Sequence, residues 1–201
     1  GYFERPDLTR DAFDEDGFYR IGDAGKLADP EDPSKGLVFD GRIAEDFKLT
    51  SGTWVHVGGL RLQVIAACAP VVEDAVITGH DRDHVGVLLF PSLNGCRRAC
   101  TNAAADLSMA DLIERAEVRD RVREGLANMS SGGGSSMRVA RALLASEPPS
   151  IDAGEITDKG YVNQRAVRVR RAAEVSRLHA SEPDGDVIRV HEGAPERGAV
   201  T

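Results

Sequence analysis

The sequence predicts an α+β fold, in which a short antiparallel sheet is flanked by helices and preceded by a hairpin-rich segment. Two strand-length apolar runs at residues 71–79 and 84–90 are separated by a Gly- and Asp-containing turn, which is typical of adjacent antiparallel strands. Apolar residues recur at helical spacing over 106–129, as one helix or two, and over 164–178. Residues 1–40 are rich in Asp, Gly and Pro and predict turns and a hairpin, not a helix.

Within the hairpin-rich segment, an acidic turn at 14–17 lies between aromatic residues. Short strands are expected at 21–27 and 37–39, because the connection between them carries two prolines and ends in glycine. This strand-loop-strand unit leads directly to Arg42.

The remaining elements follow from local pattern and composition. An amphipathic helix is expected at 58–69, where Pro70 stops the helical spacing, and a strand at 138–145. The Ser- and Gly-rich stretch 130–136 predicts a flexible loop. From His179 onward Glu, Pro, Gly and Asp predominate, so we expect a disordered tail at 179–201.

Composition excludes several classes of function. The chain has 201 residues, 41% of them hydrophobic, which is enough to bury a core. Its net charge of −8 works against binding to nucleic acid or anionic lipid. Its apolar runs fall far short of the roughly 20 residues that span a bilayer, and residues 1–7 contain no apolar signal core. We therefore expect a cytoplasmic protein with no nucleic-acid or membrane partner.

Familiar metal, hydrolase and phosphate-loop patterns are also missing from the sequence. The cysteines lack a nearby histidine pair that would complete a zinc site, and we expect them to be free thiols: Cys68, Cys96 and Cys100. Three histidines show no Ser or Asp partner at a spacing that indicates a triad: His56, His80 and His84. The stretch 130–136 lacks the Gly-x-x-x-x-Gly-Lys-Ser/Thr order of a phosphate loop.

Asp23 is the first candidate binding residue. It follows a glycine beside a predicted strand, where its carboxylate can accept hydrogen bonds from two neighbouring hydroxyls of a ribose. The alternative is an ordinary turn aspartate, because Gly-Asp is common in turns.

Arg42 and Lys159 are the two candidate cations. Arg42 follows a glycine at the end of the second strand, where its planar guanidinium can face ribose or phosphate, or alternatively form a surface ion pair with Asp40 or Glu45. Lys159 lies in a loop before a basic helix, where its ammonium can stabilise developing negative charge. The alternative for Lys159 is a solvated loop lysine.

These residues lie in ordered motifs that resemble a known superfamily. The segments at 1–23 and 40–48, containing Tyr-Arg-Ile-Gly-Asp and Asp-Gly-Arg, are similar to adenylate-forming acyl-CoA synthetases. Within that superfamily, the segments 45–55 and 156–167, the latter reading Ile-Thr-Asp-Lys-Gly-Tyr-Val-Asn-Gln-Arg-Ala-Val, resemble the feruloyl-CoA synthase family. The resemblance covers most of residues 1–170.

The resemblance implies a domain organisation. Residues 1–40 would be the C-terminal end of a large AMP-binding domain that also carries the acid pocket and the phosphate loop. Residues 41–178 would be a small C-terminal domain that rotates about a hinge at 40–44. Residues 179–201 would be the tail.

The resemblance also implies a reaction and a role for each candidate. An acid and ATP would give acyl-AMP and pyrophosphate, and CoA would then displace AMP, with Mg²⁺ offsetting the triphosphate charge. Asp23 would bind the ribose hydroxyls, Arg42 the ribose and phosphate, and Lys159 would stabilise charge as the carboxylate attacks the α-phosphate.

The implied partners are a carboxylic acid of the hydroxycinnamic class and the missing N-terminal ATP-binding domain. Without that domain we expect no complete catalysis. The alternative hypothesis is a stand-alone interaction or regulatory module that keeps the fold and has lost the chemistry.

Overall fold

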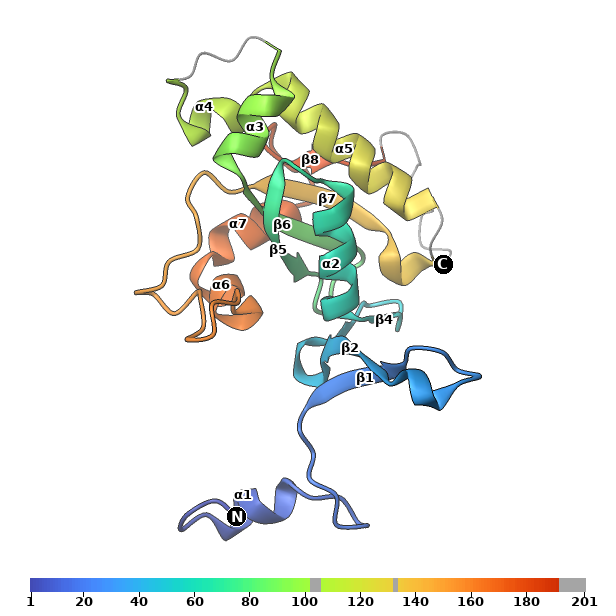
Figure 1. Cartoon of the computed structure of the whole chain (residues 1–201). Coiled ribbons are helices and arrows are strands. Elements are labelled where there is room, and N and C mark those ends of the chain that lie inside the picture. The colour runs from blue at the N-terminus through green and yellow to red at the C-terminus, as the bar shows by residue number, and fades with distance from the viewer. Residues whose placement is uncertain (102–105, 132–133, 192–201) are drawn as a thin grey trace, which may run out of the picture. The chain divides into compact units, whose positions relative to one another are not determined.

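The computed structural model describes residues 1–101, 106–131 and 134–191 (Figure 1). These residues form two compact units, Gly1–Ala44 and a larger unit that begins at Glu45. The division falls directly after the segment Asp-Gly-Arg-Ile-Ala at 40–44.

The first unit is built from one helix and one hairpin. Helix α1 (Pro6–Asp11) precedes the strands β1 (Asp23–Leu27) and β2 (Leu37–Arg42), which pair antiparallel and are joined by the 3-10 turn η1 (Pro33–Lys35). The hairpin is confirmed, but the expectation that this segment contains no helix is wrong. Pro6 begins α1, where the missing N–H of proline costs nothing, and Asp7 places a negative charge in the first turn.

The second unit contains the remaining elements. In chain order they are η2 (Ile43–Glu45), at the boundary of the units, then β3 (Phe47–Lys48), β4 (Trp54–Val55), α2 (Val57–Ala67), β5 (Val72–Thr78), β6 (Val85–Pro91), α3 (Leu93–Ala99), α4 (Met109–Ile113), α5 (Ala116–Ser131), η3 (Ser135–Met137), β7 (Val139–Leu144), α6 (Gln164–Arg170), α7 (Ala172–Leu178) and β8 (Ile188–Arg189).

Four of these strands form one sheet in the order β5-β6-β7-β8. The predicted β5–β6 hairpin is antiparallel, as expected, and β8 pairs antiparallel with β7. The β6–β7 pair is parallel, because the chain crosses through α3, α4 and α5 before it returns as β7. The α+β class is therefore confirmed, with a mixed sheet in place of a wholly antiparallel one.

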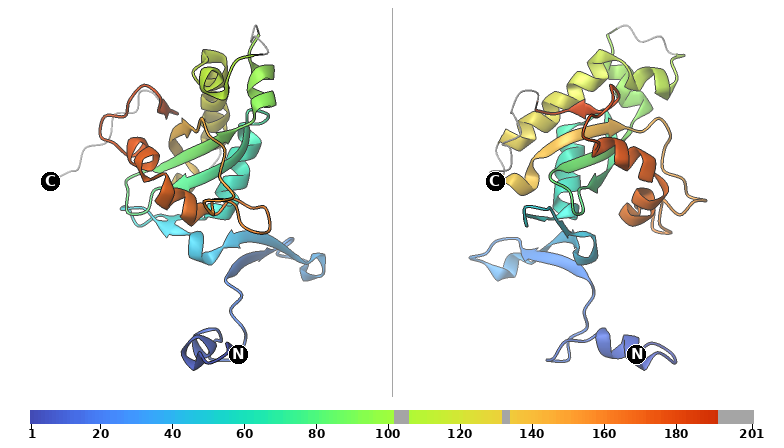
Figure 2. Two further views of the ribbon diagram at one scale, coloured as in Figure 1. Left: turned by 90° about the vertical axis from the view of Figure 1, so that its left-hand side faces the viewer. Right: turned by 180° about the vertical axis from the view of Figure 1, so that it is seen from behind.

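Helices cover both faces of this sheet (Figures 1 and 2). Helices α2 and α5 pack on one face, and α6 and α7 pack on the other. Alternate strand residues divide between two clusters, since neighbouring side chains of a strand point to opposite faces. Val87 and Leu89 join the α2–α5 side, and Leu88 and Phe90 join the α6–α7 side.

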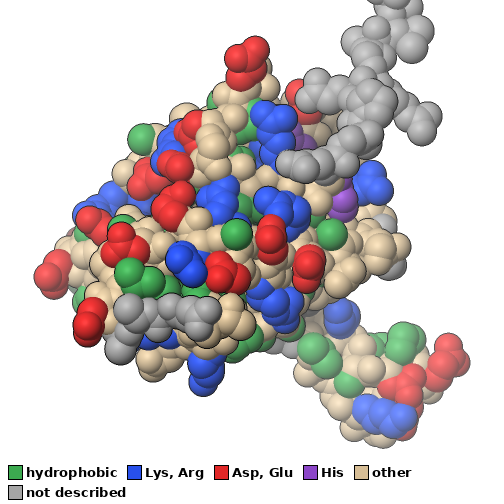
Figure 3. Space-filling view, turned by 90° about the horizontal axis from the view of Figure 1, so that it is seen from above, with side chains coloured by type: hydrophobic (Ala, Val, Ile, Leu, Met, Phe, Trp, Pro, Cys, Tyr) green, Lys and Arg blue, Asp and Glu red, His purple; other side chains and the backbone are tan. Residues whose placement is uncertain are grey.

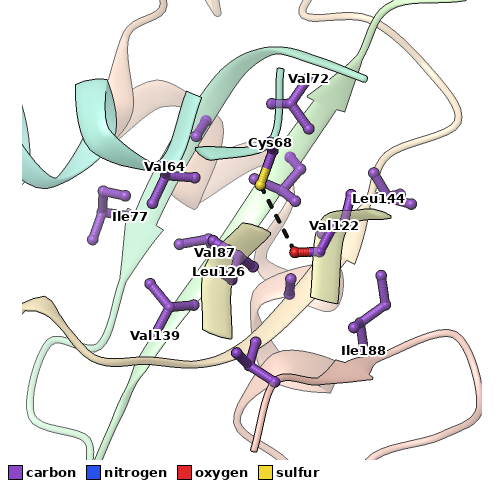
Figure 4. Close-up of a cluster of buried hydrophobic side chains, with 14 of the residues drawn as sticks. Val64, Cys68, Val72, Ile77, Val87, Val122, Leu126, Val139, Leu144 and Ile188 are labelled. Carbon is purple, nitrogen blue, oxygen red and sulfur yellow. Dashed lines mark hydrogen bonds between the residues drawn. The ribbon is translucent and has the colours of Figure 1, made fainter. Parts of the chain in front are cut away.

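The larger cluster contains all three cysteines, and Figure 4 shows Cys68 among its apolar neighbours. Cys68 is fully buried, and its thiol lies 4.0 Å from the carbonyl oxygen of Val122 on α5. Burial raises the pKa of this thiol to about 12. All three cysteines are free and buried, so the prediction of free thiols is confirmed.

Two predicted helical segments have different bounds in the structure. The stretch 106–129 forms two helices, but α5 continues to Ser131, two residues into the predicted loop. Residues 132–133 of that loop lie outside the described residues, and Ser135 begins a 3-10 turn. The basic stretch 164–178 is interrupted at Arg171, whose side chain is buried between α6 and the loop before it.

The expectation of disorder directly after residue 178 is wrong for residues 179–191. The backbone carbonyls of this segment accept hydrogen bonds from Arg119 and Arg141, while Arg177 pairs with Asp184 at 2.6 Å. Three apolar residues in and next to β8 are buried and hold the segment against the core: Val187, Ile188 and Val190. The rest of the predicted tail, 192–201, lies outside the described residues.

Charges of both signs are interspersed on the face of the molecule shown in Figure 3. Among the described residues, no helix combines the length and the apolar character that crossing a bilayer requires.

Candidate functional site

The hairpin of the first unit brings Asp23 and Arg42 together. Asp23 begins β1 and Arg42 ends β2, and in the antiparallel ladder their Cα atoms are direct partners. Arg42 Nε lies 3.9 Å from Asp23 Oδ1. A glycine with positive φ precedes each of them, Gly22 at +78° and Gly41 at +98°, a conformation that glycine adopts at little cost.

Lys159 lies at the tip of a tight turn in the second unit. Ile156 and Val162 pair across its base, and Thr157 donates its N–H to the carbonyl oxygen of Tyr161 at 2.8 Å. Gly160 has a φ of +81° and donates to the carbonyl oxygen of Thr157 at 2.9 Å. The turn therefore closes on itself and presents the Lys159 side chain to solvent.

A buried ion pair holds the base of this turn. Glu155 is fully buried, and its carboxylate accepts from Arg171 at 2.8 and 2.9 Å and from Arg170 at 3.1 Å. The backbone N–H of Ser150 donates a further bond of 2.8 Å. The hydrogen bonds from Arg171 outweigh burial and lower the pKa of Glu155, so this buried carboxyl is ionised.

The start of the second unit is fixed by Asp46. Its carboxylate accepts the N–H of Val57 at 2.9 Å, which caps the first turn of α2, and its second oxygen lies 3.0 Å from His56 Nδ1. Asp46 follows the boundary between the units by two residues. The residues directly after the predicted hinge are thus attached to a helix of the core.

Three further histidines of the second unit have structural partners. His80 stacks on Phe47 with ring centroids 4.2 Å apart. His84 and His179 lie with centroids 4.8 Å apart, and His179 Nε2 is 2.9 Å from the hydroxyl of Thr78. No Ser-His-Asp arrangement follows from these contacts.

Metal binding has no candidate centre in the described part of the chain, where no group of three His, Cys, Asp or Glu residues is suitably placed. The residues present therefore do not fit an Mg²⁺ site of their own. No step of the chemistry discussed below is assigned to that ion.

Chemically, the first unit offers an anionic acceptor beside a permanent cation, and the second unit offers an ammonium on a rigid turn. The sequence predicted these three side chains, Asp23, Arg42 and Lys159. It did not indicate Glu155, whose carboxylate holds the base of the Lys159 turn, or Asp46, which caps α2. Asn163 caps α6, because its side-chain oxygen accepts the N–H of Ala166 at 3.1 Å. Asparagine is a preferred N-cap residue, and it is a local signal that this helix starts directly after the turn.

Comparison with known proteins places most of the second unit in a family. Residues 59–183 match the family described as the AMP-binding enzyme C-terminal domain. A probable acyl-activating enzyme 16 of Arabidopsis thaliana is 23% identical over 186 residues, which cover 89% of this chain and 25% of that protein. A carboxylic acid reductase of Segniliparus rugosus is 25% identical over 205 residues, covering 100% of this chain and 16% of that protein.

Solved structures share the fold. The adenylation domain of a carboxylate reductase from Mycobacterium chelonae superimposes with a TM-score of 0.69 at 22% identity, covering 90% of this chain and 26% of that one. The adenylation domain of the Segniliparus rugosus carboxylic acid reductase, in complex with AMP and a co-purified carboxylic acid, gives a TM-score of 0.66 at 22% identity, covering 89% and 26%. The chain spans about a quarter of the length of the first Arabidopsis relative.

Proposed function

Because the chain belongs to the AMP-binding enzyme C-terminal domain family, we propose that it is the C-terminal part of an ATP-dependent acid–CoA ligase. The complete enzyme joins an acid to ATP, releasing pyrophosphate and forming an acyl-adenylate. The CoA thiol then attacks the acyl carbon, and AMP leaves as the thioester forms. In this proposal the first unit is the nucleotide-facing end of the large domain, and the second unit belongs to the small one.

The pairing of Asp23 with Arg42 is the observation that carries this proposal. Two hydroxyls of a ribose need one acceptor with several lone pairs, and a carboxylate provides it. The adjacent guanidinium complements the α-phosphate through planar, charge-assisted donors. Asp23 is assigned to the ribose hydroxyls and Arg42 to ribose and phosphate.

Lys159 is assigned to the adenylation step. As the carboxylate oxygen attacks the α-phosphate, negative charge builds on the phosphoryl oxygens, and an ammonium placed there stabilises the transition state. Lys159 belongs to the second unit and Asp23 to the first. By the family resemblance, the second unit would rotate about residues 40–44 to bring Lys159 to the nucleotide. The boundary between the large and the small domain is proposed to lie between residues 40 and 41, and the small domain includes residues 179–191, which supply β8 to its sheet.

The first unit supports the proposal of an absent N-terminal domain. Apart from Gly41, none of residues 1–38 and 41–44 is buried, and large apolar side chains are exposed, including Phe3 at 90% and Leu37 at 76%. Apolar surface of this kind marks a contact face. We assign that contact to the preceding ATP-binding domain of the same protein.

The acid is proposed to be a hydroxycinnamate such as ferulate, on the strength of the segments 45–55 and 156–167. The acceptor is proposed to be CoA. One Arabidopsis thaliana relative, 23% identical over 186 residues, is named a long-chain-fatty-acid–[acyl-carrier-protein] ligase, so a carrier protein is the acceptor to test against CoA.

Pyrophosphate exchange tests the proposal. The complete gene product containing this chain is incubated with ATP, labelled pyrophosphate and either ferulate or a long-chain fatty acid, and label entering ATP is measured. Ferulate-dependent exchange, followed by thioester formation with CoA, is expected. Exchange with the fatty acid but not with ferulate would show that the substrate is a fatty acid. A thioester formed on a carrier protein but not on CoA would show that the acceptor is a carrier protein. No exchange with any acid would favour a non-catalytic interaction module.

A further inference from the structure

We propose that Glu155, acting through Arg171, is a positioning residue for Lys159. It fixes the Lys159 turn to the helices and sheet of the second unit, so that Lys159 is delivered by motion of the whole unit and not by motion of its own loop. This inference rests on the role proposed above for Lys159.

Four N–H groups bond to the buried carboxylate of Glu155. Glu155 receives three N–H···O bonds from Arg170 and Arg171 and one from the Ser150 backbone. Arg171 also donates to the carbonyl oxygens of Glu147 at 3.0 Å and Pro148 at 2.8 Å. Glu155 and Arg171 therefore tie the chain before the turn to the helices after it.

Glu155 also bonds across the base of the turn through its backbone. Its carbonyl oxygen accepts the N–H of Asn163 at 2.8 Å, one residue before α6 begins. The next residue, Ile156, pairs with Val162. Both arms of the turn are thereby bonded within three residues of Lys159 on either side.

Helix α6, which follows the turn, is itself bonded to the sheet. Gln164 is 2% exposed, and its amide donates to the carbonyl oxygen of Ala75 at 2.9 Å and accepts the N–H of Ile77 at 3.0 Å. β5 is an edge strand of the sheet, so one of its sides has no neighbouring strand. The Gln164 side chain bonds two backbone groups of β5, as a neighbouring strand would.

The anchoring continues to the centre of the sheet. The Arg171 guanidinium lies 4.9 Å from the ring centroid of Phe90, at the end of β6. A cation over an aromatic face and two carboxylate bonds leave Arg171 little freedom. A shift of the Lys159 turn would break the bonds of Glu155 to Arg170 of α6 and to Arg171, which lies over Phe90 of β6.

A buried ion pair can also serve stability alone, and the two roles make different predictions. A stability role lowers the melting temperature and leaves each folded molecule as active as before. A positioning role lowers the rate of the step that uses Lys159, because a displacement of about 1 Å can cost on the order of 100-fold. The half-reaction that does not use Lys159 is unaffected in the folded molecules.

The experiment compares Glu155→Gln with the unchanged complete gene product. The expected result is a fall in kcat for pyrophosphate exchange of about 10- to 100-fold, with the KM for ATP and acid changed by less than about 3-fold. Thioester formation from supplied acyl-adenylate and CoA is retained. Arg177→Gln is the matched control, since Arg177 lies on α7 and pairs with Asp184, away from the turn.

A double variant and a milder variant keep the inference testable if Glu155→Gln folds poorly. Glu155→Gln with Arg171→Gln is expected to lose no more exchange activity than the single change, because the pair acts as one unit. Arg170→Gln removes only the half-exposed partner, and is expected to speed hydrogen exchange at Gly160 and Tyr161 and to slow pyrophosphate exchange.

The outcomes separate this inference from the role of Lys159 itself. If Lys159→Ala leaves pyrophosphate exchange unchanged, the proposed role of Lys159 is wrong. If Lys159→Ala slows exchange while Arg170→Gln and folded Glu155→Gln match the Arg177→Gln control, Lys159 keeps its role and the positioning role of Glu155 is overturned. Equal loss of both half-reactions in Glu155→Gln also overturns it.

Discussion

Arg42 and Asp23 are paired across the β1–β2 ladder, but their nearest charged atoms stand 3.9 Å apart, beyond hydrogen-bond length. Their side chains are 65% and 41% exposed. An exposed ion pair at this distance contributes little to the stability of the hairpin. The carboxylate and the guanidinium therefore keep bonding capacity for a ligand.

The first prediction concerns the chain on its own. We expect residues 1–201 to bind ATP or AMP more weakly than about 1 mM, a binding free energy smaller than about 4 kcal/mol, because the exposed Asp23–Arg42 pair is only one part of a nucleotide pocket. Isothermal titration calorimetry measures this directly. Micromolar ATP affinity, lost in Asp23→Asn, would show that the chain carries a complete site.

The second prediction separates the two half-reactions in the complete gene product. Lys159→Ala is expected to slow adenylation by on the order of 100-fold or more, because an ammonium facing developing phosphoryl charge is removed. Thioester formation from supplied acyl-adenylate is expected to change by less than about 3-fold, because Lys159 moves with the second unit. Lys26→Ala, in the first-unit hairpin, is the control. Equal losses in both steps would contradict the assignment.

A third prediction concerns acid sensitivity and His179. The hydroxyl of Thr78 donates to the carbonyl oxygen of Gly86, so the Nε2–H of His179 must be the donor to Thr78. The other ring nitrogen has no hydrogen-bond partner among the described residues. Burial, followed by the charges of His84, Arg82 and Arg141, lowers the pKa of His179 to about 4.

A lowered histidine pKa means that the unfolded chain binds the proton more tightly than the folded chain. Stability is therefore lost as the pH falls from about 6.5 toward 4, by about 1–2 kcal/mol once solvent screening of the half-buried ring is allowed for. Urea unfolding at pH 7 and pH 5 is expected to show a smaller difference in His179→Gln than in the unchanged chain. His191→Gln, at an exposed histidine, should retain the original difference.

Local signals in the sequence were enough for the hairpins and for the Asp23–Arg42 pair. The strands that carry these two residues are joined by a single short connection, so predicting the hairpin also predicted their proximity. The same holds for β5 and β6 and for the end of α2 before Pro70. In each case the information lies within about 20 residues.

The polar contacts of Gln164 and His179 could not be predicted in this way, because their partners are distant in sequence. Gln164 bonds β5 across 87 and 89 positions, and His179 bonds Thr78 across 101. No periodicity marks such a residue before the fold is known. The segment 179–191 was misjudged for a related reason: its average composition is polar, but order depends on a few apolar residues and on arginines of α5, β7 and α7.

The last prediction tests the packing of the α2–α5 layer that supports the sheet. Gly125 is buried in α5, where an added Cβ would lie 2.9 Å from the carbonyl carbon of Ala67 at the end of α2, and closer still to its oxygen. Alanine favours a helix over glycine by about 1 kcal/mol, but forcing the two backbones apart costs more than this gain. Gly125→Ala is expected to destabilise the chain by about 1–3 kcal/mol, measured by urea unfolding. Gly134→Ala is the control, since its Cβ would meet nothing within 4 Å. A Gly125→Ala protein as stable as the control would show that α2 and α5 can separate without cost.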